Sequence, residues 1–257
     1  MIERISKSEK LKSRGIPTVY FSSVDSTNSA ARRHAAEGGA TPTLFLADSQ
    51  SAGRGRMGRS FFSPAETGIY MTLLFDVTHD APTSTVALTS AAAVAVVRAA
   101  SAVTGADCLI KWVNDVYVGG RKACGILAES FCFGERRYAC VGVGVNLCTS
   151  DFPEELRDIA GALRKDATQE LRRELTVAIA AELFDIFEDV RRGDTSYMTE
   201  YRSRSMVLGK RVTFVKNGFA NEGVAVDIEG DGGLVVETDI GERTVLNSGE
   251  ITLRIKD

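Results

Sequence analysis

The alternation of apolar and polar residues predicts a series of strands over the first 206 residues. Short apolar runs bounded by polar or glycine-containing segments are typical of buried strands. A polar Asn114-Asp115 pair separates two of these runs, which indicates a turn between them. The predicted strands cover residues 43–47, 68–75, 108–112, 116–118, 125–133 and 137–147, and the last two are expected to pair.

Three segments predict helices. An alanine-rich run follows Asp25, a residue suited to capping a helix N-terminus, and ends at Gly38-Gly39. Residues 84–104 form a second alanine-rich run that Gly105 stops, and residues 170–192 show the clearest helical period. The run at 84–104 contains Ser, Thr and Arg98, so it fits a buried helix better than a membrane span.

The pattern changes after about Met206. Gly, Asn and Asp clusters separate five short β-like runs, at residues 211–215, 223–228, 233–237, 243–246 and 251–255. Five short strands in about 50 residues are typical of a small barrel. We therefore expect two domains, residues 1–206 and residues 207–257.

Composition and charge narrow the class of protein. The 257 residues contain 31 Lys and Arg against 34 Asp and Glu, which gives a net charge of −3. A net-acidic chain is a poor general binder of nucleic acid, because phosphate neutralisation needs a positive surface. The N-terminal residues carry charges but no apolar run of the kind a signal peptide has. We expect a cytoplasmic protein without nucleic-acid or membrane partners.

The cysteines and histidines argue against a metal centre. The five cysteines are Cys108, Cys124, Cys132, Cys140 and Cys148, and no pair has the C-x-x-C spacing. Only two histidines are present, so a zinc site or a Cys/His nucleophile is not expected. We interpret the cysteines as small buried hydrophobic residues in a reducing compartment.

The segment from Ser51 to Arg59 is the most informative for chemistry. It contains Gly53-x-Gly55-x-x-Gly58, but Ser60-Phe-Phe-Ser-Pro64 follows it instead of a helix start, which argues against a dinucleotide fingerprint. Glycines interleaved with arginines predict a cationic loop able to close over an anion. A solvated surface loop and a nucleic-acid-binding loop remain the alternatives at this point.

The segment Lys111-Trp-Val-Asn-Asp115 predicts a polar turn, and Lys122 follows it at the start of an apolar strand. A lysine that enters an apolar strand pays a desolvation cost and usually needs an anionic partner. Each feature also has a structural interpretation. The lysine can extend its charged head to solvent from the strand end, and Trp112 fits the core better than a stacked ligand.

Taken together and in order, four elements resemble the biotin protein ligase family, biotin–[acetyl-CoA-carboxylase] ligase. The family pattern is D-S-T-N, then Q-x-A-G-R-G-R-x-G-R, then K-W-P-N-D with a lysine before G-I-L-x-E, then G-x-G-x-N. These motifs stand here at residues 25–28, 50–59, 111–115 with Lys122 and 125–129, and 142–146. Each motif alone is weak, since D-S-T-N alone is a helix cap and G-x-G-x-N alone a glycine-relieved strand. The combination is specific.

The resemblance implies the fold and the reaction. The fold is α+β, with a mixed β-sheet flanked by helices, related to class II aminoacyl-tRNA synthetase and lipoate ligase catalytic domains, followed by an SH3-like barrel. In the implied first step, the carboxylate of biotin attacks the α-phosphate of ATP, with Mg²⁺ bridging the phosphates, to give biotinyl-5′-AMP and pyrophosphate. A lysine of a biotin carboxyl carrier protein then takes the biotinyl group as an amide.

The resemblance also implies roles for individual residues. Lys122, Arg56 and Asp115 would be catalytic, with Lys122 on the carboxylate and Asp115 orienting or deprotonating the carrier lysine. The biotin-binding set would be Ser26, Thr27, Asn28, Gln50, Arg54, Gly55, Arg56, Lys122 and Gly125. The ATP-binding set would be Arg56, Arg59, Phe61, Lys111, Asn114, Asp115 and Asn146, with no metal held by the protein itself.

Three residues depart from the family pattern. Met57 replaces a common loop Arg, Val113 replaces the Pro of K-W-P-N-D, and Phe61 stands where a Trp is frequent beside adenine.

Only about 20 residues precede Asp25, so we expect a ligase without a DNA-binding domain or repressor activity. The family includes both monomers and homodimers. A lipoate or octanoyl transferase and a biotin-binding protein without transfer activity remain the rival functions.

Overall fold

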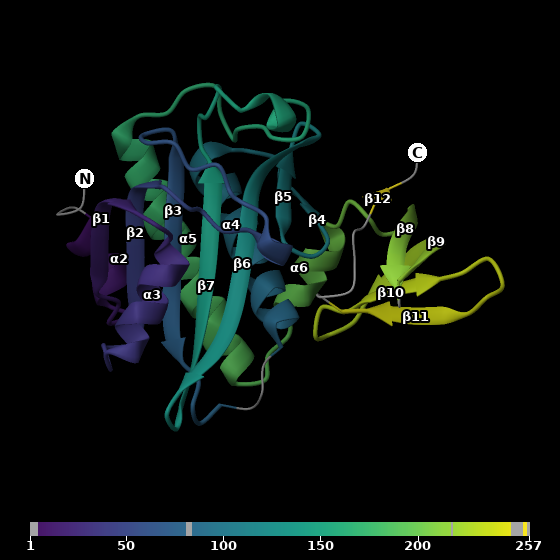
Figure 1. Ribbon diagram of the computed structural model, residues 1–257, viewed down its shortest axis with the longest axis horizontal. Helices are drawn as coiled ribbons and strands as arrows, with labels where there is room; N and C mark the ends of the chain where they lie inside the picture. Colours follow the sequence, from purple (N-terminus) through teal and green to yellow (C-terminus); the bar gives the residue numbers. More distant parts are fainter. Residues whose placement is uncertain (1–4, 81–83, 217, 248–253, 256–257) are drawn as a thin grey trace.

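The computed structural model describes residues 5–80, 84–216, 218–247 and 254–255, and its largest feature is a seven-stranded mixed sheet (Figure 1). The strand order is β1-β2-β3-β7-β6-β5-β4. Only the β1–β2 pair is parallel, and the other neighbours are antiparallel. The strands are β1 (Thr18–Val24), β2 (Thr43–Gln50), β3 (Gly68–Asp76), β4 (Leu109–Lys111), β5 (Asp115–Val118), β6 (Arg121–Phe133) and β7 (Arg136–Asn146).

Helices cover both faces of this sheet. Helix α3 (Thr27–Ala36) packs on one face, and α4 (Thr85–Thr104) and α5 (Gln169–Arg191) pack together on the other (Figure 1). Successive side chains of a strand point to opposite faces, and β2 shows this directly. Its Phe45 belongs to the cluster around α3, whereas Leu44 and Leu46 belong to the larger core with α4 and α5. The mixed sheet flanked by helices is therefore confirmed.

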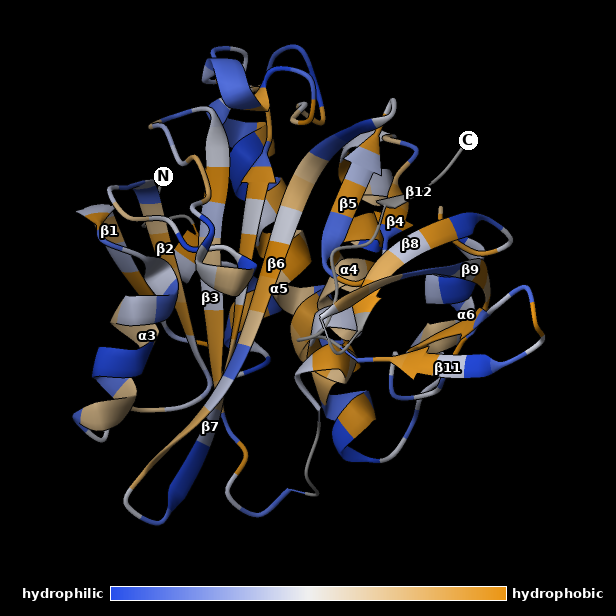
Figure 2. Ribbon diagram, turned by 45° about the vertical axis from the view of Figure 1, so that its right-hand side comes forward, coloured by the Kyte–Doolittle hydropathy of each residue, from blue (hydrophilic) through white to orange (hydrophobic). Residues whose placement is uncertain are grey.

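Helix α4 forms the centre of the larger core, as Figure 2 shows by its hydrophobic colouring. The Ser84 hydroxyl accepts a hydrogen bond from the Ala87 amide at its start, and Gly105 ends it in the left-handed conformation. Among the described residues, α4 is the one helix long and apolar enough to cross a membrane, but 78% of its most apolar window is buried inside the molecule. The predicted buried helix at 84–104 is confirmed, and so is the amphipathic helix α5.

The C-terminal part forms a second, five-stranded antiparallel sheet, which we call the C-terminal sheet. Its order is β11-β10-β9-β8-β12, and it lies beside the β4 edge and helix α6 (Tyr197–Ser203) (Figure 1). Residues 251–253 of the predicted last strand lie outside the described residues. The strands are β8 (Arg211–Lys216), β9 (Phe219–Ile228), β10 (Leu234–Glu237), β11 (Arg243–Leu246) and β12 (Arg254–Ile255).

Several features differ from the expectations. Strand β1, helix α6 and the short helix α2 (Glu9–Lys12) have no clear signal in the sequence pattern. The N-cap of α3 is Ser26, not Asp25. The Asp25 carboxylate instead accepts two hydrogen bonds from Arg33, at 2.8 and 2.9 Å. These bonds lower the pKa of Asp25 to about 2.

The prediction of buried cysteines is correct for three positions, is met only in part by the half-buried Cys148, and is wrong for Cys132. All five cysteines are free, and Cys108, Cys124 and Cys140 are buried. Burial raises the pKa of Cys108 to about 11 and that of Cys140 to about 12, as expected for inert core thiols. Cys132 is exposed, because it lies near the end of β6, where the β6–β7 hairpin extends past the helices (Figure 1).

Candidate active site

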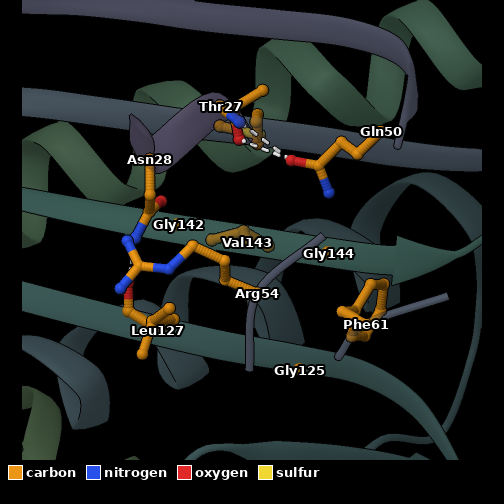
Figure 3. Close-up of a pocket in the computed structure, with 11 residues that line it drawn as sticks. Thr27, Asn28, Gln50, Arg54, Phe61, Gly125, Leu127, Gly142, Val143 and Gly144 are labelled. Atoms are coloured by element: carbon orange, nitrogen blue, oxygen red, sulfur yellow. Dashed lines mark hydrogen bonds between the residues drawn. The ribbon is translucent and has the colours of Figure 1, made fainter. Parts of the chain in front are cut away.

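A pocket lies where α3 begins, over the middle strands of the large sheet (Figure 3). We call it the main pocket. Strand residues form its floor, α3 and β2 supply polar groups, and the loop at residues 53–61 crosses its entrance. Five predicted biotin-binding residues, Gly125 among them, meet here with the predicted nucleotide residue Phe61. The pocket is lined by Thr27, Asn28, Gln50, Arg54, Phe61, Met71, Gly125, Leu127, Gly142, Val143 and Gly144.

The glycines of β7 make room for this pocket. A Cβ atom at Gly142 would lie 2.2 Å from Asn28 Oδ1, and one at Gly144 would lie 2.6 Å from Cε1 of Phe61. Real Cβ contacts are not this short, so Asn28 and the Phe61 ring occupy space that only glycine leaves open. The two glycines of the Gly-x-Gly pattern thus leave space on β7 for the side chains of Asn28 and Phe61. The pattern therefore shapes the pocket as well as the strand.

Replacing Gly144 by alanine should therefore disturb the pocket. The added methyl group must displace the Phe61 ring, and overpacking of this kind costs about 1–3 kcal/mol. We expect a lower free energy of unfolding in urea, with recovery in the Gly144→Ala/Phe61→Leu double variant. Gly230→Ala is the matched control, because a Cβ at Gly230 meets no atom within 4 Å. Equal stability of Gly144→Ala and Gly230→Ala would contradict the packing argument.

A chain of hydrogen bonds orients the polar groups of the pocket. The Gln50 Oε1 atom accepts from the Thr27 amide at 2.9 Å and from the Thr27 hydroxyl at 3.2 Å, and Gln50 Nε2 donates to Ser63 Oγ at 2.9 Å. The buried Thr72 hydroxyl contacts Asn28 Oδ1 at 2.6 Å. These contacts fix the orientation of the side-chain amides of Gln50 and Asn28, with each oxygen facing a donor. Ser26, next to Thr27, is buried at the helix cap but does not line the pocket.

Glu129, the last residue of the G-I-L-x-E motif, is a site residue to which the sequence analysis assigned no role. Its carboxylate accepts two hydrogen bonds from the Arg54 guanidinium, at 2.8 and 3.1 Å, and a third from Asn28 Nδ2 at 2.9 Å. A bidentate Arg–carboxylate pair is strong and directional. Glu129 therefore joins the loop, α3 and β6 at the edge of the pocket. The available signal was a lone carboxylate in the mainly apolar run 125–133.

The loop at residues 53–59 folds back on itself as a small hairpin. The Gly55 amide donates to Arg59 O at 2.7 Å, and the Phe61 amide donates to Gly53 O at 2.9 Å. A Cβ atom at Gly53 would lie 2.3 Å from Phe61 O, so this close approach requires glycine. Arg59 and Met57 at the tip are exposed.

Arg56 leaves this hairpin and reaches the turn between β4 and β5. Its Nη1 donates to Asn114 Oδ1 at 2.9 Å, and Asn114 Nδ2 donates to Ile126 O at 3.3 Å. Burial lowers the pKa of the Arg56 guanidinium, and Arg59 acts in the same direction, whereas Asp115 raises it. Burial makes the charged form of this guanidinium less favourable, so a bound anion beside Arg56 would be stabilised by it and would stabilise it in turn.

Lys122, at the start of β6, forms an ion pair with Asp115. Its Nζ atom lies 2.7 Å from Asp115 Oδ1, with both side chains about one quarter exposed or less. The pair adjoins the main pocket, because a Cβ atom at Gly125 would lie 3.3 Å from Lys122 Cε and 3.1 Å from Phe61 Cε2. Lys122, Asp115, Arg56 and Asn114 thus form a charged cluster, which we call the cationic cluster, beside a largely neutral pocket.

The remaining predicted residues do not line the main pocket. The Lys111 ammonium lies 5.7 Å from the centre of the Tyr117 ring. Asn146 is buried and donates to Lys122 O at 3.4 Å and Gly161 O at 3.2 Å, so it ties β7 to β6. Gly55 serves the loop hairpin. Among the described residues, no group of three His, Cys, Asp or Glu side chains could hold a metal ion.

This arrangement can bring two anions together. The main pocket can hold a small molecule with a polar head, and the adjoining Lys122 can receive an acid group at its end. The arginines of the loop can receive a second, more highly charged anion. Cations placed between two anions offset their repulsion, which is the main obstacle to a reaction between them.

Two family models match the sequence. The model described as the Biotin/lipoate A/B protein ligase family matches residues 20–146, and the Biotin protein ligase C terminal domain matches residues 207–254. The bifunctional ligase/repressor BirA of Bacillus spizizenii is 31% identical over 259 residues, covering 95% of this chain and 78% of that protein. The biotin–[acetyl-CoA-carboxylase] ligase of Mycobacterium tuberculosis is 32% identical over 211 residues, covering 80% and 76%.

Solved structures share the fold over most of the chain. The biotin protein ligase from Aquifex aeolicus in complex with biotin and ATP superposes with a TM-score of 0.79 at 25% identity, covering 93% of this chain and 99% of that chain. The biotin protein ligase from Leishmania major in complex with biotinyl-5-AMP has a TM-score of 0.61 at 24% identity, covering 91% and 98%. The second likeness concerns the fold alone.

Proposed function

We propose that this chain, which belongs to the biotin/lipoate A/B protein ligase family, acts as an ATP-dependent biotin–[acetyl-CoA-carboxylase] ligase. It activates biotin as biotinyl-5′-AMP and then transfers the biotinyl group to a lysine of a biotin carboxyl carrier protein. The observation that carries the proposal is the contact between the main pocket and the cationic cluster at Gly125. That contact supports the inference that an acid group of a ligand in the pocket would reach Lys122.

In the first step, the main pocket holds the ring head of biotin with its polar groups facing Thr27, Asn28 and Gln50. The biotin carboxylate replaces Asp115 as the partner of Lys122, and Arg56 faces the phosphates. A carboxylate oxygen attacks the α-phosphorus of ATP, the bond to pyrophosphate breaks, and pyrophosphate leaves. Charge accumulates on the phosphoryl oxygens in this step, so preplaced cations lower the barrier.

In the second step, the amine of the carrier lysine attacks the acyl carbon of the adenylate, and the bond to AMP breaks. Asp115, released from Lys122, lies where it can accept the proton that the amine loses. Magnesium enters with ATP as part of the substrate and neutralises phosphate charge.

The direct test uses the purified chain with biotin, MgATP and a carrier domain, followed by intact mass measurement. We expect the carrier to gain one biotinyl group, and no gain when biotin or ATP is omitted. Modification with lipoate in place of biotin would favour the transferase alternative on the same fold. Retention of biotin without any transfer would favour a binding protein.

The finer properties remain part of the proposal. We infer a cytoplasmic enzyme. We also infer that it has no DNA target, because the net charge of −3 disfavours phosphate contacts. The Bacillus relative is bifunctional by name, so the lack of repressor activity needs its own measurement. Retention on DNA at physiological salt would contradict it. Sedimentation decides between monomer and homodimer.

Replacing Glu129 by alanine should weaken biotin binding. The substitution removes three hydrogen bonds and leaves the Arg54 guanidinium and the Asn28 amide without their carboxylate. Charge-assisted hydrogen bonds contribute about 1.5–3 kcal/mol each, so we expect the Kd for biotin to rise about tenfold or more. Calorimetric titration with biotin alone measures it.

A conservative variant and a surface control test whether the effect of Glu129→Ala comes from the lost carboxylate. Glu129→Gln retains an acceptor but loses the charge, so its Kd should lie between those of the wild type and Glu129→Ala. Glu135→Ala, on the exposed β6–β7 turn, serves as the matched control. A wild-type Kd in Glu129→Ala would show that the carboxylate does not order the pocket.

A further inference from the structure

Trp112 is the one tryptophan of the chain, and it contacts the C-terminal sheet rather than the pocket. Its side chain is 6% exposed and belongs to the core, as the sequence predicted. The indole Nε1–H donates to the carbonyl oxygen of Gly232 at 2.8 Å. A buried indole N–H that found no acceptor would be costly, so this bond constrains both partners.

Gly232 belongs to a tightly tied turn between β9 and β10. The Glu229 amide donates to Gly233 O at 2.8 Å, and the Gly232 amide donates to Glu229 O at 3.0 Å. Gly232 has a φ of 91°, and a Cβ atom there would lie 2.7 Å from Ser90 Oγ and 2.8 Å from Val86 Cγ1. Only glycine therefore lets this turn rest against α4 and present its carbonyl to Trp112.

Helix α6 also contacts the Trp112 segment, at the next residue, Val113. The Tyr201 hydroxyl, fully buried, donates to Val113 O at 3.1 Å. The next residue of α6, Arg202, donates from Nε to Ile228 O of the C-terminal sheet at 2.7 Å. The segment is thus held at the Trp112 side chain by the C-terminal sheet and at the Val113 carbonyl by α6, and Arg202 ties α6 to the same sheet.

The other end of this short segment carries the cationic cluster. Asn114 and Asp115 follow Trp112 by two and three residues, and they hold Arg56 and Lys122 at 2.9 and 2.7 Å. Charge-assisted contacts weaken steeply when their geometry changes. A displacement of Trp112 therefore moves the groups that face the phosphates, whereas the polar groups of the main pocket lie on other elements.

We propose that Trp112 is a positioning residue through which the β9–β10 turn of the C-terminal sheet sets the geometry of the cationic cluster. The C-terminal sheet then supports adenylate formation without any contact of its own with the nucleotide. The inference rests on the proposed function for the identity of the anion, ATP. It separates the nucleotide step, which depends on this contact, from recognition of the biotin ring head, whose polar partners Thr27, Asn28 and Gln50 lie on other elements.

The first test is Trp112→Phe in the full chain. It removes one buried hydrogen bond and keeps an aromatic ring, so we expect the KM for ATP to rise about tenfold and adenylate formation to slow. The Kd for biotin, measured without nucleotide, should rise less than the KM for ATP, because the ring-head contacts of biotin lie on other elements. An unchanged KM and rate, with only a lower melting temperature, would reduce Trp112 to a core residue and overturn the proposal.

The second test leaves Trp112 in place and moves its partner. Gly232→Ala should impair the nucleotide step in the same way and shift the emission of the single tryptophan. Gly241→Ala is the matched control, with a φ of 79° in the same sheet but no atom within 4 Å of its Cβ. Equal kinetic effects of the two variants would mean general strain in the sheet and would overturn the proposal.

The two levels of inference can be told apart. A wild-type chain that forms no adenylate would refute the proposed function. Tryptophan emission of Gly232→Ala against Gly241→Ala would still show whether Gly232 sets the position of Trp112. Should Trp112→Phe fail to fold, the kinetic comparison of the two glycine variants decides the proposal.

Discussion

Replacing Lys122 by methionine is expected to lower the rate of biotinyl-adenylate formation about a thousandfold, in line with the loss of one preplaced transition-state donor. Methionine keeps most of the side-chain volume but has no charge, so Asp115 loses its partner at 2.7 Å. The carboxylates of biotin and Asp115 would then lie side by side with nothing between them. Pyrophosphate release under saturating biotin and ATP measures the rate.

Three variants make this result specific. Lys122→Arg keeps the charge with a different shape and should retain more activity than Lys122→Met. Asp115→Asn should spare adenylate formation more than transfer, because Asp115 is proposed to act on the carrier amine. Lys210→Met removes an exposed lysine near the C-terminal sheet and should leave the rate unchanged. Full activity of Lys122→Met with a wild-type circular dichroism spectrum would remove Lys122 from the mechanism.

Locally determined features were the most predictable from the sequence. Helix α4 begins after the Ser84 hydroxyl cap and ends at the left-handed Gly105, so its bounds agree with the predicted 84–104 within one residue. Both signals depend on residues next to the helix end and on no distant partner. The desolvation argument for Lys122 also favoured an anionic partner beside it, over a charged head that extends to solvent. The identity of that anion, Asp115, depends on the pairing of β5 with β6, where Asp115 lies opposite Gly125.

Long-range partners could not be predicted in this way. Glu129 contacts Arg54 across 75 residues, and Trp112 contacts Gly232 across 120 residues. Nothing near either residue in the sequence indicates the partner, because sheet order and the placement of the C-terminal sheet bring them together. The motifs therefore located the strand ends and loops that carry charge, whereas the contacts that orient the charges required the three-dimensional structure.

The same limit explains the error at Cys132. Cys124 and Cys132 lie eight residues apart on the one strand β6, so their side chains have the same parity. Cys124 is buried and Cys132 is exposed. Parity decides the face of a strand, but burial also needs an element that covers that face. The β6–β7 hairpin extends past the helices at Cys132, and this extension has no signature in the sequence.

Replacing Arg56 by glycine is expected to release the adenylate before transfer. Arg56 joins the loop hairpin to the β4–β5 turn through one charge-assisted hydrogen bond to Asn114, at 2.9 Å. Such a bond contributes about 1.5–3 kcal/mol, so its loss should speed escape of biotinyl-5′-AMP about tenfold to a hundredfold. The free adenylate acylates exposed amines. Biotin on a bystander protein such as albumin, measured by mass spectrometry, should rise accordingly.

Asn114→Ala separates the tie from the charge in this prediction. It removes the same hydrogen bond but leaves the Arg56 guanidinium free to face the phosphates, so it should leak adenylate while forming it faster than Arg56→Gly. Lys122→Met, which forms little adenylate, should label no bystander. If Arg56→Gly retained its adenylate as tightly as the wild type, the loop could not be the closure of the site. Any difference in adenylate release among the three variants would then have to come from the cationic cluster alone.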